Sequence, residues 1–280
     1  MGEASGPLGA LRIAVVACAC VVTTAAGCSR RRVPIVIPFA ARFGNQPFSC
    51  SATVNAAGST FAARDLKLYV SGVQLLAADG SALEVALRDD GAWQNDGVAL
   101  LDFEDGAGNC VDGTQGTHTE LQGMVPAGTY VGVRFTVGVP FARNHANPAT
   151  AAPPLNLGHM HWGWQAGYKF LRFEGTSAAG SVYRFHLGST QCEGTIGYIT
   201  GCARPNRAVI ELHGFAPGRT VLLDLNALLQ AVDLAAAPPD AVRGCMGGPD
   251  GPDCAEAFAA VGLDLQSGQP IATQHLFSVL

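Results

Sequence analysis

Apolar and polar residues alternate along most of the chain, and this period of two is the pattern of half-buried β-strands. The run 66–71 is the clearest case. Turn-forming clusters, for example at 89–91, 105–106 and 126–128, separate such runs. The pattern predicts ten strands: Val33–Phe39, Leu66–Leu76, Leu83–Leu87, Val98–Phe103, Tyr130–Val137, Tyr168–Phe173, Val182–Leu187, Ala208–Leu212, Thr220–Leu225 and Leu276–Leu280.

Helical periodicity is scarce and predicts only two short helices, Asn226–Leu234 and Ala255–Val261. The chain has 280 residues, of which 35 are glycine and 16 are proline, which suits many tight connections. No internal repeat or low-complexity linker divides residues 34–280, so we expect one domain there. The predicted fold is all-β, an antiparallel β-sandwich or Greek-key barrel with short helices.

The first 27 residues are predicted to be a signal peptide of the lipoprotein type. An apolar run at 13–22, too short to span a bilayer comfortably, is followed by small residues and then Cys28. This arrangement resembles a bacterial lipobox, which would make Cys28 the lipidated first residue and 28–33 a basic tether. Because Ala25 stands where a lipobox usually has leucine, ordinary secretion with a free Cys28 is the alternative. Either way, we expect a periplasmic or outer-membrane-associated protein of a Gram-negative bacterium.

Six cysteines remain once the signal peptide and Cys28 are set aside. An even number in an exported chain favours disulfides that staple the β-fold, although six cysteines allow 15 pairings. No Cys-x-x-Cys-His motif is present, so we expect no haem on this chain. Proximity along the chain favours two disulfides, Cys192–Cys202 and Cys245–Cys254, which leaves Cys50–Cys110 to join distant segments.

Charge and motif content exclude two common functions. The formal net charge is −5 with 14% charged residues, which provides no basic surface for nucleic acid. A Gly-x-Ser-x-Gly motif, typical of α/β-hydrolases, is absent. Asp102 and Glu104 are interpreted as structural residues at a strand end, because a calcium loop would show more closely spaced oxygen ligands.

The run 159–164, His-Met-His-Trp-Gly-Trp, places two imidazoles, a thioether and two indoles in six residues. Imidazole and thioether groups suit a soft, late first-row metal, copper above all. In a regular strand the two histidines would face one side and the two tryptophans the other. A site that uses both kinds of side chain therefore needs a bend at Gly163, and Met160 is expected in the core.

Five motifs in order resemble the MbnP-like family, the methanobactin-associated periplasmic copper-binding proteins. The family is also described as the four-Cys-motif member of two-gene "metallo-mystery pair" systems. The motifs are spread over most of the mature chain. They are Leu66–Leu75, the Leu-Leu-Asp-Phe-Glu segment at 100–104, Phe135–Pro140 with Phe141 and Asn144-His145, Trp162–Phe170, and His186–Cys192.

The resemblance implies a copper site made from histidines and from kynurenine, an oxidised tryptophan. It also implies a partner, a di-haem protein of the bacterial cytochrome c peroxidase type, that performs the oxidation. Opening the indole ring leaves an aryl amine, which can donate to a metal, and soft nitrogen ligands suit Cu(I). We expect metal ligands at His159, His161, His186 and Trp164, with Trp164 or else Trp162 modified and His145 in a supporting position.

The leading hypothesis is a non-enzymatic copper-binding lipoprotein, anchored to the membrane by its lipid. A copper oxidase with a histidine brace needs an N-terminal histidine, and the expected mature N-terminus is Cys28. A metal-free β-sandwich whose aromatic loop binds a protein or glycan is the remaining alternative, since Trp and Tyr are enriched in interfaces. Trp93, His118, His213 and His275 lack supporting context and are interpreted as structural.

Overall fold

β-Strands make up most of the regular structure in the computed structural model, which describes residues 1–3 and 31–280. The cleavage site and Cys28 lie outside the described residues. The strands are β1 (Arg32–Phe43), β2 (Gln46–Pro47), β3 (Thr53–Ala56), β4 (Ser59–Ala77), β5 (Ala82–Glu84), β6 (Ala86–Leu87), β7 (Gln94–Asn95), β8 (Val98–Asp102), β9 (Glu120–Pro126), β10 (Tyr130–Val137), β11 (His161–Gly163), β12 (Gly167–Ser177), β13 (Val182–Gly188), β14 (Thr190–Thr195), β15 (Tyr198–Arg204), β16 (Ala208–His213), β17 (Val221–Asp224), β18 (Val242–Cys245) and β19 (Phe277–Val279). The helices are α1 (Phe141–Asn144), the 3-10 turn η1 (Gly158–Met160), α2 (Asn226–Leu229) and α3 (Cys254–Val261).

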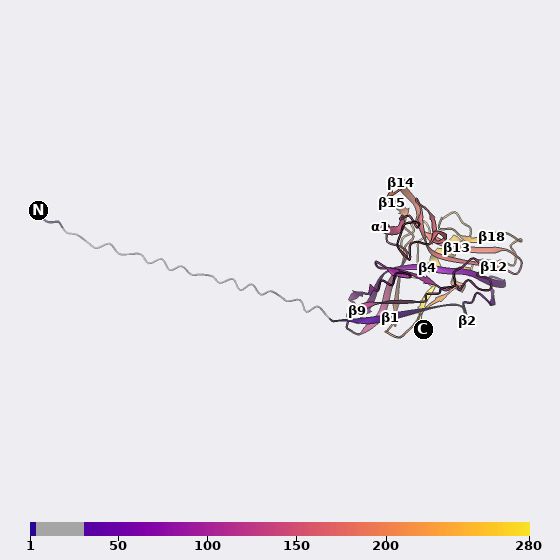
Figure 1. Ribbon diagram of the computed structural model, residues 1–280, viewed down its shortest axis with the longest axis horizontal. Coiled ribbons are helices and arrows are strands. Elements are labelled where there is room, and N and C mark those ends of the chain that lie inside the picture. The colour runs from indigo at the N-terminus through magenta and orange to yellow at the C-terminus, as the bar shows by residue number, and fades with distance from the viewer. Residues whose placement is uncertain (4–30) are drawn as a thin grey trace. The chain divides into compact units, whose positions relative to one another are not determined.

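Two sheets and a separate hairpin hold these strands (Figure 1). The smaller sheet has the order β19-β17-β1-β9-β6, with β2 added beside β1. The larger sheet has the order β16-β10-β4-β12-β13-β18, with short strands added beside β4 and β12. Strands β14 and β15 pair only with each other. Pairing is antiparallel except between β1 and β17 and between β13 and β18, so the sheets are mixed rather than purely antiparallel.

The core lies between the inner faces of the two sheets. Strand β1 alternates buried and partly exposed residues, as the period-two pattern predicts. Its Phe39 contacts Phe135 of β10 edge-to-face at 5.6 Å, and its Phe43 lies 6.0 Å from Phe173 of β12. Such aromatic pairs stabilise a core beyond the area that they bury. The prediction of a disulfide-stapled β-sandwich is confirmed.

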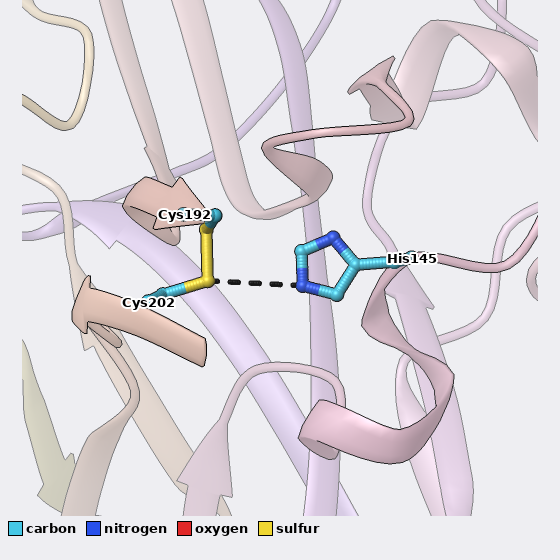
Figure 2. Close-up of side chains that lie close together, drawn as sticks. All are labelled: His145, Cys192 and Cys202. Carbon is cyan, nitrogen blue, oxygen red and sulfur yellow. Dashed lines mark hydrogen bonds between the residues drawn. A yellow bond between two sulfur atoms is a disulfide. The ribbon is translucent and has the colours of Figure 1, made fainter. Parts of the chain in front are cut away.

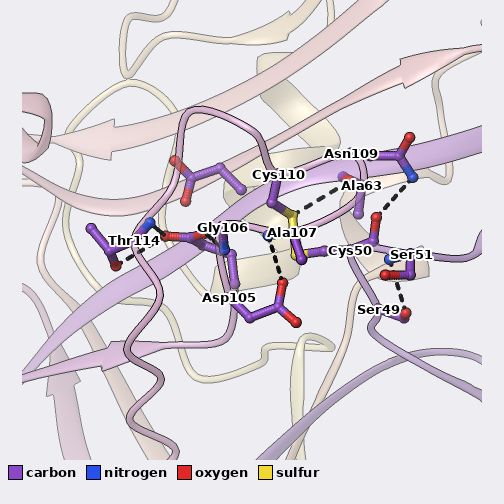
Figure 3. Close-up of a disulfide and its surroundings, with 12 residues drawn as sticks. Ser49, Cys50, Ser51, Ala63, Asp105, Gly106, Ala107, Asn109, Cys110 and Thr114 are labelled. Atoms are coloured by element: carbon purple, nitrogen blue, oxygen red, sulfur yellow. Dashed lines mark hydrogen bonds between the residues drawn. A yellow bond between two sulfur atoms is a disulfide. The ribbon is translucent and has the colours of Figure 1, made fainter.

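All three predicted disulfides are present with the predicted partners: Cys50–Cys110, Cys192–Cys202 and Cys245–Cys254. The first joins the segment before β3 to the segment after β8 (Figure 3). Beside it Asn109 donates a hydrogen bond from Nδ2 to the Cys50 carbonyl at 2.9 Å. Gly108 has φ +55°, and a Cβ there would lie 2.4 Å from the same carbonyl oxygen, so only glycine fits.

The helices and several strand ends differ from their predicted bounds. Helix α2 ends at Leu229 rather than Leu234, α3 begins one residue earlier than predicted, and the four-residue α1 was not predicted. Strand β1 begins at Arg32, so the last two residues of the expected tether pair with β9. Strand β9 was also missed, because Gly123 takes a buried position and Met124 an exposed one, which masks the alternation in the sequence. Within residues 1–3 and 31–280, no helix combines the length and the hydrophobicity needed to cross a membrane.

Candidate functional site

One row of polar side chains crosses four strands of the larger sheet. The register places Asp102 of β8 opposite Lys67 of β4, and Lys67 opposite Arg172 of β12. Arg172 in turn lies opposite His186 of β13. Side chains of directly paired residues point to the same face of a sheet, so these four form a continuous row.

Buried carboxylates surround the ammonium group of Lys67 at one end of this row. Lys67 Nζ lies 3.1 Å from Asp65 Oδ1 and 3.4 Å from Asp102 Oδ1, and it donates a hydrogen bond to Glu104. Burial by itself would lower the pKa of Lys67. The surrounding carboxylates have the larger effect, and the pKa of Lys67 is raised. Burial raises the pKa of Asp102 to about 7. The Lys67 ammonium group is thus the cation that pairs with these carboxylates, which supports the structural interpretation of Asp102 and Glu104.

His186 is the other end of the row, and one of its ring nitrogens is held by a carboxylate. Its Nε2 lies 2.6 Å from Glu174 Oε1, and the same oxygen accepts a hydrogen bond from Arg172 Nε at 2.9 Å. Hydrogen bonds from His186 and Arg172 outweigh the cost of burial and lower the pKa of Glu174 to about 2. Burial lowers the pKa of His186. A charged Glu174 therefore faces a neutral imidazole that donates from Nε2.

The second ring nitrogen of His186 is left without a partner. His186 is 5% exposed, and its Nδ1 is buried with no hydrogen-bond partner among residues 1–3 and 31–280. Because Nε2 carries the proton, Nδ1 of the neutral ring carries a lone pair. Leaving a buried polar atom unpaired costs free energy, so such an atom in a folded protein calls for an explanation such as a ligand.

Trp162 packs beside His186, with ring centroids 6.4 Å apart. Its six-membered ring lies against two glycines. A Cβ at Gly188 would come within 2.6 Å of Trp162 Cζ3, and a Cβ at Gly247 within 3.1 Å of Cη2. These two glycines therefore make the space that the half-buried indole fills.

The segment 158–164 is irregular. A bend at Gly163 was expected from the sequence if histidines and tryptophans were to share one site. Its first part is the 3-10 turn η1, and the pairing of β11 with β12 is interrupted between His161 and Gly163. His159 is exposed on this turn, and its carbonyl accepts a hydrogen bond from Lys169 Nζ at 2.7 Å. Met160 is fully buried, as predicted.

His161 packs edge-to-face on the ring of Tyr168, with centroids 4.9 Å apart. The structure of residues 1–3 and 31–280 offers no hydrogen-bond partner to its buried Nε2. Burial lowers the pKa of His161, with nearby His145 and Lys169 acting in the same direction. His161 is therefore a second neutral imidazole with an unpaired buried nitrogen.

His145 is the residue that caps α1, and it lies beside a disulfide (Figure 2). Its Nδ1 donates to the Trp164 carbonyl at 3.2 Å, and its Nε2 lies 3.7 Å from Cys202 Sγ. Asn144, which is buried, reaches the same Nε2 with its amide nitrogen at 3.3 Å. Gly167 packs so closely on Asn144 that a Cβ would lie 2.3 Å from its carbonyl oxygen. Asn144 thus connects His145 to the start of β12.

Trp164 is 39% exposed, and only its main-chain carbonyl contacts His145 through a hydrogen bond. Although part of the His159 ring is exposed, the surrounding protein removes some of its hydration, and this desolvation, followed by the cations Lys67, Arg172 and Lys169, lowers the pKa of His159 to about 4. Lys169 also acts on His161 and His186, and Arg172 acts on His186, where the Glu174 carboxylate acts in the opposite direction.

The structure brings some of the predicted site residues together and separates others. His186 lies beside Trp162, whereas His161 and Trp164 share the region of His145. Within the described part of the chain, two groups of three ligand atoms lie within 4.8 Å of one another: His145 with Cys192 and Cys202, and Glu104 with Cys50 and Cys110. The predicted set of His159, His161 and His186 is not such a group, and both observed groups contain disulfide cysteines.

Trp93 stacks on the ring of His118, with ring centroids 5.4 Å apart and an interplanar angle of 4°, in agreement with a structural role for both residues.

Glu174 is a site residue that the sequence analysis missed, although its position in the sequence pattern could have indicated it. It follows Arg172 at the next outward position of a mostly buried strand, where charged residues are uncommon without partners.

Fold and site together define an all-β, disulfide-stapled sandwich. Its distinctive feature is the segment 158–164, called here the histidine–tryptophan loop, which pairs with β12 of the larger sheet. The MbnP family model matches residues 32–247, and the chain belongs to that family. A solved structure, MbnP from Methylosinus trichosporium, is similar with a TM-score of 0.77 and 31% sequence identity. The match covers 89% of this chain and 98% of the other. The comparison with curated proteins finds no match.

Proposed function

We propose that this protein is a non-enzymatic copper-binding protein, and that the histidine–tryptophan loop with the neighbouring end of β13 forms its copper site. The proposal is supported most directly by the unpaired buried nitrogens of His161 and His186. Both imidazoles are neutral, since burial lowers both pKa values, so a metal need not displace a proton from either. Neutral imidazoles in a partly apolar environment suit Cu(I).

The surroundings of His186 also fit a ligand. Metal-binding histidines usually donate their second ring N–H to a carboxylate or carbonyl, which fixes the tautomer. Glu174 accepts that hydrogen bond at 2.6 Å and leaves Nδ1 as the metal-binding atom. When bound, copper would supply a redox-active or transferable soft cation, and the chain would supply its ligands. His159 stays a proposed ligand, and its imidazole is also neutral because its pKa is lowered to about 4.

A modified tryptophan would complete the donor set. Oxidation of Trp164 or Trp162 by two equivalents of a peroxide at the partner's haems would cleave the indole C2–C3 bond and reduce the peroxide to water. C3 becomes a ketone, C2 leaves as formate on hydrolysis, and the ring nitrogen is left as an aryl amine. Trp164 is 39% exposed, which suits access by an oxidising protein partner, and it is the first candidate. Trp162 is half-buried beside His186, which suits a ligand role, and it is the second.

The proposed partner is a di-haem protein of the cytochrome c peroxidase type, and the proposed location is the periplasm or the outer membrane. The even set of paired cysteines supports an oxidising compartment. Attachment through a lipid on Cys28 belongs to the same proposal. The role in storage, delivery or sensing would then depend on the proteins that exchange copper with the site.

Peptide mass analysis tests this function. The full chain is expressed with and without the di-haem partner, and the peptide spanning residues 157–169 is mapped in each product. We expect the mass gain of one tryptophan-to-kynurenine conversion only with the partner, together with tighter Cu(I) binding in a competition titration with a chromophoric chelator. Trp164→Phe should abolish the mass gain, and Trp162→Phe is the matched variant that decides between the two indoles.

An unmodified peptide in the presence of an active, haem-loaded partner would contradict the kynurenine part of the proposal. Cu(I) binding that is equally tight without the partner would leave a site made of histidines alone. Failure of both the modified and the unmodified protein to bind Cu(I) would overturn the copper-binding function.

A second candidate function is a metal-free interaction surface. Several large apolar side chains near the loop and the β14–β15 hairpin are exposed: Phe141 by 42%, Trp164 by 39%, Ile196 by 76% and Tyr198 by 71%. Exposed aromatic residues are typical of interfaces. Under this alternative, Cu(I) would not bind, and Tyr198→Ser would weaken capture of a protein partner without any dependence on metal.

A further inference from the structure

The Cys192–Cys202 disulfide differs from the other two in its accessibility. Cys50, Cys110, Cys245 and Cys254 are each 4% exposed or less, whereas Cys202 is only partly buried. Cys202 also lines a cavity of about 230 Å³ together with Phe141, Ser189 and Arg207. Thiol–disulfide exchange requires that a thiolate reach a sulfur atom, so this disulfide is the one most open to attack.

The backbone around this disulfide would keep the two cysteines together after reduction. Cys192 and Cys202 face each other in the register of the β14–β15 hairpin, and the disulfide closes a loop with a sequence separation of only 10. The backbone pairing of the hairpin does not involve the sulfur atoms, and opening a short loop gains less entropy than opening a long one. Gln165 Nε2 also donates to the Cys192 carbonyl at 3.0 Å, which ties the hairpin to the histidine–tryptophan loop.

His145 places a possible metal-ligating nitrogen beside the two sulfur atoms, and its hydrogen bonds define its tautomer. Nδ1 donates its proton to the Trp164 carbonyl, so Nε2 of the neutral ring carries the lone pair. Nε2 accepts from the Asn144 amide and faces Cys202 Sγ at 3.7 Å (Figure 2). Nε2 and the two sulfur atoms all lie within 4.8 Å of one another.

We propose that Cys192, Cys202 and His145 form a second Cu(I) site that opens when the disulfide between the two cysteines is reduced. A thiolate of a dithiol reductant attacks Cys202 Sγ, the S–S bond breaks, and Cys192 leaves as a thiolate. The second thiol of the reductant then attacks the mixed disulfide, releases Cys202, and leaves the reductant oxidised by two electrons. Cu(I) then binds the two thiolates and Nε2 of His145, whose lone pair gives up its 3.3 Å hydrogen bond from the Asn144 amide, and any protons on the thiols are released to water.

The chemistry of this donor set suits Cu(I). Two thiolates and one imidazole are soft ligands, and Cu(I) accepts such a low coordination number. Arg207 lines the cavity at Cys202, and a nearby cation favours the thiolate over the thiol. The disulfide would therefore act as a redox gate. The oxidised protein offers copper only the proposed histidine–tryptophan site, and the reduced protein offers a second site next to it.

The test compares the oxidised and reduced forms of the same full-length chain. The protein is treated with a dithiol reductant under anaerobic conditions, the reductant is removed, and Cu(I) is titrated against a chromophoric chelator. Maleimide labelling of the free thiols followed by peptide mapping reports which disulfide has opened. We expect labels on Cys192 and Cys202 first, one further Cu(I) bound per chain, and an ultraviolet thiolate-to-Cu(I) charge-transfer band.

Matched variants assign the ligands. The double variant Cys192→Ser/Cys202→Ser should bind the same amount of Cu(I) with and without reductant, and it keeps whatever copper the histidine–tryptophan site binds. His145→Ala should weaken the additional site at least tenfold, whereas His213→Ala, at an exposed histidine on β16, should not change it.

Three results would overturn the proposal. The first is a reduced wild-type protein that binds no more Cu(I) than the oxidised protein. The second is an equal gain in the double cysteine variant, which would place the sulfur ligands elsewhere. The third is an unchanged affinity in His145→Ala, which would remove the imidazole from the site. Because each result concerns only the gain upon reduction, it is distinguishable from failure of the proposed function.

Discussion

The two ends of the polar row across β8, β4, β12 and β13 differ in how their buried polar atoms are satisfied. At the Lys67 end, the ammonium group contacts three carboxylates. At the His186 end, one ring nitrogen contacts Glu174 and the other has no hydrogen-bond partner in the described part of the chain. Both ends are buried in the same sheet, so the difference lies in the residues and not in the environment.

This difference separates a structural cluster from a ligand site. Buried charges are tolerated when they are paired, and a fully paired cluster fixes the packing around it. A neutral imidazole with one satisfied nitrogen and one unpaired nitrogen has the form of a metal ligand supported by a carboxylate. Glu174 and Arg172 join the two ends, because Arg172 contacts Asp65 at 3.1 Å and Glu174 at 2.9 Å.

The largest expected effect is at Lys67. Lys67→Met would leave three carboxylates without their buried cation and should lower the free energy of unfolding by about 3–5 kcal/mol. Chemical denaturation measures this loss. The matched control is Arg134→Met, whose pair with Glu211 is 37% exposed on both sides and should cost no more than about 1 kcal/mol. Equal losses in the two variants would contradict a structural role for the Lys67 cluster.

Glu174→Gln should have a smaller effect, and one on copper more than on stability. Glutamine keeps the size of the side chain but weakens the hydrogen bond that fixes the His186 tautomer. Loss of such an outer partner typically lowers metal affinity about 10–100-fold. A competition titration of Cu(I) measures the change. An unchanged affinity would mean that the contact between Glu174 and His186 serves the fold alone.

Asp102 should make stability depend on pH in a predictable direction. Its pKa is raised by burial to about 7, whereas an unfolded aspartate titrates near pH 3.9. The folded state therefore binds more protons than the unfolded state between these values, and Asp102 makes stability fall as pH rises through this window. Asp102→Asn removes this contribution, so the variant should gain about 1 kcal/mol relative to wild type between pH 5 and pH 6. Urea denaturation at both pH values measures it, and a constant difference would exclude a raised pKa.

Much of the sandwich was predictable because several strands, such as β1 and β16, alternate buried and outward-facing residues. Strand β10 was predicted with the bounds it has, and β4 with its central part. Two disulfides followed from an even cysteine count and proximity along the chain, and the third, Cys50–Cys110, was the pair that remained. Short strands such as β3, β7 and β18 were missed, because two to four residues carry no measurable period and depend on partners far away in the sequence.

The site was predictable by composition but not by geometry. The run 159–164 drew attention to histidines and tryptophans, yet period-two alternation could not anticipate the 3-10 turn at its start. The sequence also contained no information that His145 would lie against Cys202, since this contact joins residues 57 positions apart. Such contacts depend on the topology of the sheets, which a local pattern does not encode.

The most direct test of the account is the Cu(I) affinity of His161→Ala/His186→Ala, produced with the di-haem partner and compared with wild type and with His213→Ala. Because the double variant removes both unpaired nitrogens, we expect its Cu(I) affinity to fall at least a hundredfold while its fold, checked by denaturation, is retained. His213→Ala should bind as wild type does. Wild-type affinity in the folded double variant would contradict the central claim that these two nitrogens mark the copper site.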